Sequence, residues 1–167
     1  MKHTTLTALF LSIIFISCTP SEKKETNTND AQQAQTVTEV TENVSITIEG
    51  NDMMQFNLNK IEISAGQTVT LTLKHVGQMS SVAMGHNWVL LKAGTDKAAF
   101  GMAAVSSKDS GYIPLDMKES VIAFTPVIGG GESATITFEA PAAGYYEFIC
   151  SFPGHYGIMN GSFVVLP

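Results

Sequence analysis

The sequence predicts an all-β fold over residues 44–167, a Greek-key β-sandwich or barrel interrupted by one short helical insertion. Two observations predict it. Apolar and polar residues alternate in several short runs, and these runs are rich in Val, Ile and Thr. Alternation at a period of two is typical of half-buried strands, because successive side chains of a strand point to opposite faces. Roughly seven short strands separated by turn signals are typical of sandwiches and barrels.

The clearest alternation predicts antiparallel strands at residues 44–48, 68–73 and 134–138. Weaker runs complete the expected set at residues 61–64, 87–91, 145–150 and 162–166. Turn signals separate these runs, among them Ala65-Gly66, Gly77-Gln78, Pro141-Ala142-Ala143-Gly144 and Asn160-Gly161. One stretch breaks the alternation. Residues 95–105 combine a helix-capping residue with helix formers, so they predict the short helix.

The first 17 residues predict a signal peptide, with a basic start followed by the apolar run 6–16. A membrane-spanning helix needs ~20 residues, so this shorter run indicates export and removal of residues 1–17. The tetrapeptide Phe15-Ile16-Ser17-Cys18 resembles a bacterial lipobox, in which a small residue precedes a Cys that is lipidated and becomes the mature N-terminus. An ordinary signal peptide cleaved near Ser17, with an incidental Cys, is the alternative.

Residues 18–43 predict a lipidated N-terminus followed by a disordered tether. From Thr19 onward this stretch contains two Val residues and no aromatic side chain. It cannot bury enough apolar surface to offset the entropy lost on ordering, although a short helix is the alternative. We therefore expect a monomeric lipoprotein of the bacterial periplasm, anchored to the membrane through Cys18.

The charge balance excludes one class of partner. The chain has 15 acidic residues against 9 basic ones, all of them Lys, and a formal net charge of −6. Recognition of phosphates needs clustered basic side chains, often with bidentate Arg. We therefore expect no nucleic acid partner. An anionic surface favours cationic or neutral partners instead.

Three potential metal ligands lie close together near the C-terminus. Cys150, His155 and Met159 fall within one expected strand–loop–strand connection, and the turn signal Pro153-Gly154 lets this loop fold back. Another histidine, His86, opens an expected strand and could complete the set.

These residue types favour copper. A thiolate and two imidazoles form a trigonal set, and a thioether as a weak axial ligand suits copper in both oxidation states. Structural zinc sites prefer four strong N, S or O ligands, and Met is not among them. A catalytic Cys–His pair is a competing interpretation, but no acyl-transfer motif or orienting Asn or Asp accompanies it. A chance meeting of a buried Cys, a surface His and a core Met is the remaining alternative, which the joint spacing Cys-x4-His-x3-Met disfavours.

The sequence resembles azurins, small blue copper proteins of the cupredoxin fold. The resemblance covers residues 44–167 and is carried by the stretches 50–57, 84–90, 128–132 and 150–159. It implies a cupredoxin domain that binds one copper ion of type 1. The ligands that it implies are His86, Cys150 and His155, with axial contacts from Met159 and the Gly85 carbonyl.

The resemblance also implies roles for residues around the ligands. Backbone amides at Asn87 and Phe152 are expected to hydrogen-bond the Cys150 sulfur, and their side chains to tie two loops together. His75 matches a histidine that lies near the copper without binding it. Trp88 matches a tryptophan buried in the core.

In one respect the sequence departs from azurins, which usually carry a disulfide near one end of the barrel. At the corresponding places this chain has Val44 and the turn Ala65-Gly66-Gln67. Removal of such a crosslink generally costs ~2–5 kcal/mol, so we expect other packing to offset it or stability to be lower.

The function implied by the resemblance is one-electron transfer without enzymatic turnover, since three strong ligands and a Met leave little room for a substrate. Electrons are expected to pass through His155, within an apolar patch at Met79, Ala83, Met84, Met102, Phe152, Pro153, Gly154, Gly157 and Ile158. The family implies c-type cytochromes, or a copper or haem reductase or peroxidase, as redox partners. Two alternatives stay open: a lipoprotein for copper storage or delivery, suggested by the eight Met residues, and an enzyme with two copper centres, for which the His residues are too few.

Overall fold

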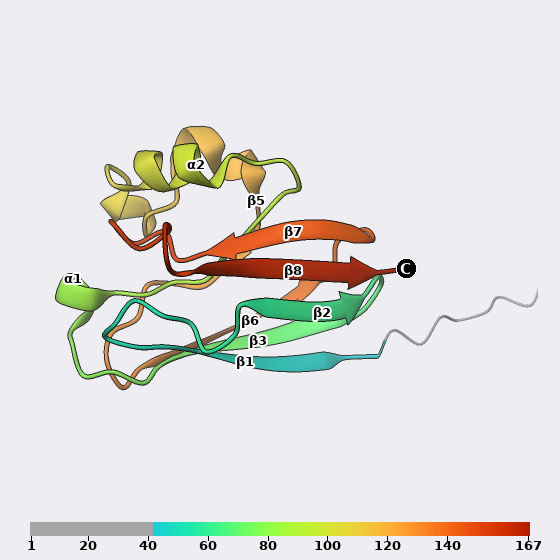
Figure 1. Cartoon of the computed structure of the whole chain (residues 1–167), viewed down its shortest axis with the longest axis horizontal. Helices are drawn as coiled ribbons and strands as arrows, with labels where there is room; N and C mark the ends of the chain where they lie inside the picture. Colours follow the sequence, from blue (N-terminus) through green and yellow to red (C-terminus); the bar gives the residue numbers. More distant parts are fainter. Residues whose placement is uncertain (1–41) are drawn as a thin grey trace, which may run out of the picture. The chain divides into compact units, whose positions relative to one another are not determined.

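A computed structural model describes residues 42–167, so the predictions for residues 1–41 lie outside the described residues. The described part forms a two-sheet sandwich, as the alternation predicted (Figure 1). One sheet has the strand order β1 (Val44–Gly50), β3 (Thr68–His75), β6 (Ser133–Glu139). The other has the order β2 (Lys60–Ser64), β8 (Asn160–Leu166), β7 (Gly144–Ile149), β4 (Val89–Leu91), β5 (Val121–Phe124). The strands form two sheets rather than one closed barrel.

The prediction of purely antiparallel pairing is wrong for two strand pairs. Strand β1 pairs in parallel with β3, and β2 pairs in parallel with β8. The chain crosses to the other sheet at β2 between β1 and β3, so β1 and β3 enter their sheet from the same end. Alternation along a strand reports which face is buried and carries no information on the direction of its neighbour.

The core lies between the two sheets and follows the predicted alternation. Ile48, Leu71 and Leu73 reach it from the three-stranded sheet, and the rings of Phe148 and Phe163 from the other. Polar residues of the same strands face outward, and Thr72 and Thr135 form a cross-strand hydroxyl contact of 2.8 Å on the outer face.

The buried tryptophan confirms the core position expected for Trp88. Its ring is fully buried and lies 5.7 Å from the ring of Phe148 and 6.1 Å from that of Phe163. Its indole nitrogen has no hydrogen-bond partner among the described residues, so the side chain contributes through packing.

Helix α2 (Lys97–Ala104) confirms the predicted insertion. The Asp96 carboxylate caps it by accepting hydrogen bonds from the backbone N–H groups of Ala98 and Ala99. The sequence did not reveal the other short elements: α1 (Ser81–Met84), the 3₁₀ segments at Lys108–Ser110 and Leu115–Ser120, and strand β5. These elements are too short to show a period. Within residues 42–167, each helix lacks the length or the apolar character required to cross a membrane.

Ordinary packing and hydrogen bonds hold the region where azurins usually carry a disulfide. Val44 packs against the core cluster at the start of β1. The turn after β2 is fixed by backbone N–H groups: that of Ala65 donates to the Leu166 carbonyl (2.8 Å) and that of Ser64 to the Gln67 side chain (2.8 Å).

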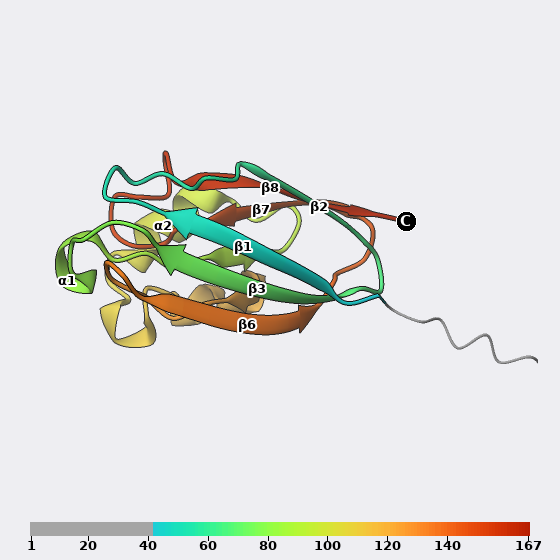
Figure 2. The same ribbon diagram turned by 90° about the horizontal axis from the view of Figure 1, so that it is seen from below.

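The two views show how the strands position the ligand-bearing segments (Figures 1 and 2). Strand β1 begins at the end of the sandwich where β2 and β8 finish. The connections after β1, β3 and β7 gather at the opposite end, together with α1. His86 and the 150–159 loop therefore meet at one end of the sandwich.

Candidate metal centre

Three buried side chains converge at this end. The ligand atoms of His86, Cys150 and His155 lie within 4.8 Å of one another. The two imidazole Nδ1 atoms are 3.3 Å apart, and the Cys150 Sγ is 3.9 Å from Nδ1 of His86 and 3.5 Å from Nδ1 of His155. Thus the structure brings together the three candidate ligands that the sequence predicted, although His86 and Cys150 are 64 residues apart in the chain.

His86 is held from both sides. Its backbone N–H donates to the Ile128 carbonyl at 3.0 Å, and its carbonyl accepts from Ile128 at 2.8 Å. Its Nε2 lies 2.9 Å from the Asn51 carbonyl. Since a carbonyl only accepts, Nε2 carries the proton, and Nδ1 is free to bind a metal. Burial lowers the pKa of His86, which favours this neutral form.

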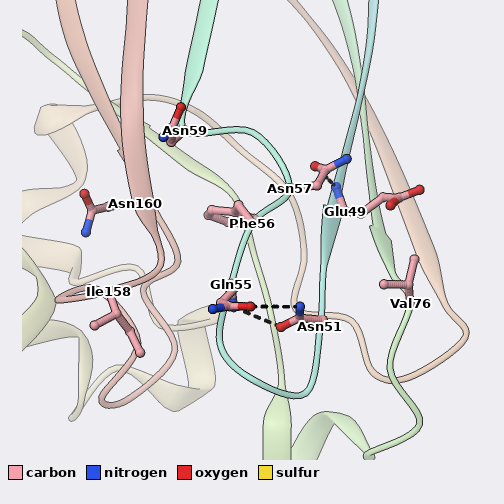
Figure 3. Close-up of a pocket in the computed structure, with 9 residues that line it drawn as sticks. All are labelled: Glu49, Asn51, Gln55, Phe56, Asn57, Asn59, Val76, Ile158 and Asn160. Atoms are coloured by element: carbon pink, nitrogen blue, oxygen red, sulfur yellow. Dashed lines mark hydrogen bonds between the residues drawn. The ribbon is translucent and has the colours of Figure 1, made fainter.

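The turn that supplies the Asn51 carbonyl is fixed by its own side chain. The Asn51 Oδ1 accepts from the backbone N–H groups of Met53 (3.0 Å) and Gln55 (3.2 Å), and its Nδ2 lies 3.3 Å from the Gln55 Oε1 (Figure 3). The turn borders a surface hollow of about 440 Å³. The turn contributes to the centre by presenting the Asn51 carbonyl oxygen to His86.

His75 lies beside the cluster, with its ring stacked on that of His86 at 4.3 Å and an interplanar angle of 15°. Its Nε2 lies 2.9 Å from the Met84 carbonyl, and its Nδ1 accepts from the Gly77 N–H at 3.1 Å. Both ring nitrogens are thus engaged with the backbone, as expected for a residue that is near the metal without binding it.

Cys150 directly follows strand β7 and is fully buried, and its backbone N–H donates to the Met159 carbonyl at 2.8 Å. Burial raises the pKa of the Cys150 thiol to about 12, while the backbone N–H groups of Asn87 and Phe152 act in the opposite direction. These are the two amides that the azurin resemblance placed at the sulfur.

A residue that the sequence did not single out, Ser151, links the two ligand segments. The Asn87 side chain accepts from the Ser151 backbone N–H at 2.8 Å and donates to the Ser151 Oγ at 2.8 Å. The Ser151 hydroxyl donates in turn to the Tyr112 carbonyl at 2.8 Å. The expected tie through the Asn87 side chain is therefore present, and its partner is Ser151. Only its place next to Cys150 could have drawn attention to it.

His155 lies in the loop between β7 and β8. Its backbone N–H donates to the Phe152 carbonyl at 3.0 Å, and its ring centroid is 4.9 Å from that of Phe152. Burial is the main cause that lowers the pKa of His155 to about 4, and the neighbouring His86 and His75 lower it further. The imidazole is therefore neutral at pH 7 and its Nδ1 faces the cluster.

The donor set fits copper. Three ligand atoms about 2.0–2.3 Å from a shared ion in a trigonal plane lie about 3.5–4 Å apart, close to the separations found here. The set is one thiol and two neutral imidazoles in a buried site, with Met159 fully buried beside it. Blue copper sites use this combination of ligands.

Comparison with known proteins agrees with this chemistry. The family model "Copper binding proteins, plastocyanin/azurin family" matches residues 42–166. The chain belongs to this family. Azurin-1 of Alcaligenes xylosoxydans xylosoxydans is 42% identical over 121 residues, which cover 70% of this chain and 93% of the relative. The outer membrane protein H.8 of Neisseria meningitidis serogroup B is 43% identical over 122 residues, which cover 71% of this chain and 66% of the relative.

A solved structure shows the same fold. Auracyanin A, a "blue" copper protein from the green thermophilic photosynthetic bacterium Chloroflexus aurantiacus, aligns with a TM-score of 0.66 and 38% identity. The alignment covers 74% of this chain and 98% of auracyanin A. This plastocyanin/azurin family member is therefore a cupredoxin, its cofactor is copper, and its class is that of electron-transfer copper proteins.

The two expected axial positions lie at the site. Met159 packs with Cys150 and Phe152, and a Cβ atom added to Gly50 would lie 2.8 Å from the Met159 methyl carbon and 2.8 Å from the His86 ring. Gly85 is buried immediately before His86. Gly50 is thus required to let the ligands approach β1, a role that the sequence did not reveal.

Most positions of the expected apolar patch are accessible to solvent. Met79, Met102 and Ile158 are large exposed apolar side chains, whereas Phe152 is buried and contributes little surface. Val82 on α1 is 81% exposed and was missed because no periodic run contains it.

Proposed function

We propose that this cupredoxin is a one-electron carrier whose copper is bound by His86, Cys150 and His155. The observation that carries the proposal is the buried convergence of two Nδ1 atoms and one Sγ within 4.8 Å. Met159 and the Gly85 carbonyl are proposed as the axial contacts. Three strong ligands leave no open position for a substrate, which favours a carrier over an enzyme.

Bound copper supplies the change between Cu(I) and Cu(II). The chain supplies a site that is already assembled: the Asn51 carbonyl fixes the tautomer of His86, and the Asn87 side chain fixes Ser151 next to Cys150. The thiol, whose pKa is about 12, releases its proton when the metal binds. Two N–H groups then remain to stabilise the sulfur.

We propose His155 as the point of electron entry and exit. The patch of apolar side chains at Met79, Met102 and Ile158, joined by Val82, offers a surface for brief docking of redox partners. Adaptable Met side chains suit contacts that form and dissolve quickly. The partner classes proposed by family resemblance are c-type cytochromes and a copper or haem reductase or peroxidase.

Addition of Cu(II) to the purified mature chain, followed by visible spectroscopy and a redox titration, tests the proposal. Intense blue colour with reversible one-electron cycling is expected, and the Cys150→Ser variant should lose the colour. The Tyr145→Phe variant, in which an exposed residue near the start of β7 is changed, should keep it. Colourless Cu(I) that passes readily to a chelator would support copper storage or delivery instead.

We also propose that residues 1–17 direct export and that Cys18 carries a lipid, with residues 18–43 as a tether to the domain at 44–167. The sequence Phe15-Ile16-Ser17-Cys18 supports this proposal, and similarity to a relative named as an outer membrane protein is in keeping with it. The expected location is the periplasm, on a membrane. Cys18→Ser followed by fractionation should release the protein, and unchanged membrane retention would contradict the anchor.

A further inference from the structure

The ligand loop is anchored in two different parts of the interior. Cys150, Phe152 and Met159 form one small buried cluster at the metal centre. Tyr156, which directly follows His155, packs instead against a second cluster that contains Phe100 of helix α2. His155 therefore lies between an anchor at the metal side and an anchor at the helix side.

The helix has a recess for the Tyr156 ring at Gly101. A Cβ atom placed on Gly101 would lie 2.3 Å from Cγ and 2.3 Å from Cδ1 of Tyr156, a separation that real contacts do not show. Glycine inside a helix generally costs about 0.5–1 kcal/mol relative to alanine. A glycine at this buried position is thus explained by the ring that lies on it.

Helix α2 is itself fixed to the rest of the domain. Its first turn is capped by Asp96, and the Lys97 ammonium lies 2.7 Å from the Glu147 carboxylate on strand β7. Phe100 and Ala104 are fully buried beneath it. A ring that packs on this helix therefore rests on a firm support.

The loop needs such a support because its own backbone is permissive. Gly154 has a φ of +83°, and Gly157 has no atom within 4 Å of an added Cβ. Besides the bond from the His155 N–H to the Phe152 carbonyl, local hydrogen bonds hold the end of the loop: the Met159 N–H donates to the His155 carbonyl at 2.8 Å, and the Asn160 side chain donates to the Tyr156 carbonyl at 2.9 Å.

We propose that helix α2 acts as a clamp on the ligand loop, and that Tyr156, seated over Gly101, is the positioning residue that fixes His155. The inference rests on the proposed copper function, because the purpose of the clamp is to hold one ligand still while the charge of the centre changes. Tyr156 acts through packing: its ring fills the recess, and its hydroxyl is not needed.

The test compares Tyr156→Ala with Tyr156→Phe in the full mature chain. Loss of the ring should speed release of copper to a chelator about tenfold. Truncation of a packed aromatic side chain lowers stability substantially, and only part of that lost stability is expected to affect the ligand loop. The reduction potential should shift as well. Tyr156→Phe should behave as the wild type in both measurements.

Gly101→Ala provides an independent variant with the ring still present. Helix propensity alone predicts that this change stabilises the protein, whereas the clamp predicts faster copper release, since the new methyl group displaces the ring. Val105→Ala, at the exposed C-terminal end of the same helix, is the matched control and should leave release unchanged.

Ile113→Val controls for general loss of stability, because Ile113 belongs to the same cluster without being part of the loop. If Tyr156→Ala speeds copper release no more than Ile113→Val does, or if Tyr156→Phe fails to restore it, the clamp is refuted. Amide exchange of Ile158 and Met159 in the metal-free chain should also be faster in Tyr156→Ala. This readout is independent of copper, so it separates failure of the clamp from failure of the proposed copper function.

Discussion

The two histidines of the metal centre are held in different ways. His86 has its second ring nitrogen bonded to the Asn51 carbonyl, a stacked neighbour in His75, and a backbone bridge to Ile128. His155 lies in a loop with two glycines, and its contacts with its surroundings are mainly the ring of Phe152 and short backbone hydrogen bonds.

The difference separates two tasks within one centre. A ligand enclosed by the sandwich defines where the metal binds, since its orientation is fixed before binding. A ligand in a surface loop brings the centre within reach of another protein. The loop then depends on contacts with other elements, such as the packing of its Tyr156 ring against helix α2.

The largest expected effect separates the two histidines by chemical rescue. His155→Gly should regain a blue copper centre when imidazole is added, because the exposed residues Gly154 and Gly157 flank it in the loop. His86→Gly should not, since its removal leaves a buried gap and an unpaired Asn51 carbonyl. Visible spectra recorded during imidazole titration measure this, and equal rescue of both variants would contradict the comparison.

The next effect concerns how tightly each segment is packed. Gly50→Ala places a methyl group 2.8 Å from the His86 ring and should destabilise the metal-free protein by about 1–3 kcal/mol. Gly157→Ala, in the loop of His155, meets no neighbour within 4 Å and should change stability by less than about 0.5 kcal/mol. Urea unfolding of both variants provides the measurement. A larger loss of stability in Gly157→Ala than in Gly50→Ala would show that the loop of His155 is packed more tightly than the surroundings of His86.

The metal-free protein should lose stability as the pH falls from about 6.5 to about 4. The pKa of His155 is lowered from 6.5 to about 4, so the unfolded chain binds more protons than the folded one within this window. Stability therefore rises with pH across it. In His155→Gln the slope should be smaller, and the part that remains comes from His86, whose pKa is also lowered. Unfolding curves at several pH values measure both slopes, and identical slopes would show that His155 is not buried in its neutral form.

The smallest effect sharpens the account of the Asn51 turn. Gln55→Ala removes an exposed side-chain contact of 3.3 Å but leaves the backbone bonds that hold the turn. We expect a change in stability within about 0.5 kcal/mol and an unchanged copper spectrum. A clear spectral shift would show that the amide of Gln55, and not the backbone alone, positions the carbonyl that His86 contacts.

Much of this architecture could be predicted from the sequence because the strands are amphipathic. The runs at β1, β3 and β6 alternate over their full length, and each turns its apolar face toward the core, fully buried in β3 and partly buried in β6. The parallel pairings and the short strand β5 could not be predicted, since alternation says nothing about direction and four residues show no clear period.

The centre itself divides in the same way. Cys150, His155 and Met159 share one loop, so their spacing was informative on its own. His86 lies far from them in the sequence and was only a histidine that could complete the set, until the resemblance to azurins implied it as a ligand. The Asn51 carbonyl and the Ser151 hydroxyl were not found, because a backbone oxygen has no side-chain signature and serine is common in loops. Gly50 was quoted only as part of a motif, since the need for a missing methyl group is visible only when His86 and Met159 are in place.

The direction of strand β1 separates the point where the domain is attached from the metal centre. The strand starts at Val44 and ends at Gly50 beside the His86 ring, so its start is about 20 Å from the centre. A segment that precedes Val44 joins the domain at the end far from the metal. This applies equally to the proposed lipid-bearing tether and to an engineered linker to an electrode. Electron transfer between such a support and the copper would need a diffusing redox carrier or rotation of the domain. Direct transfer would require attachment at the end of the sandwich that bears the metal.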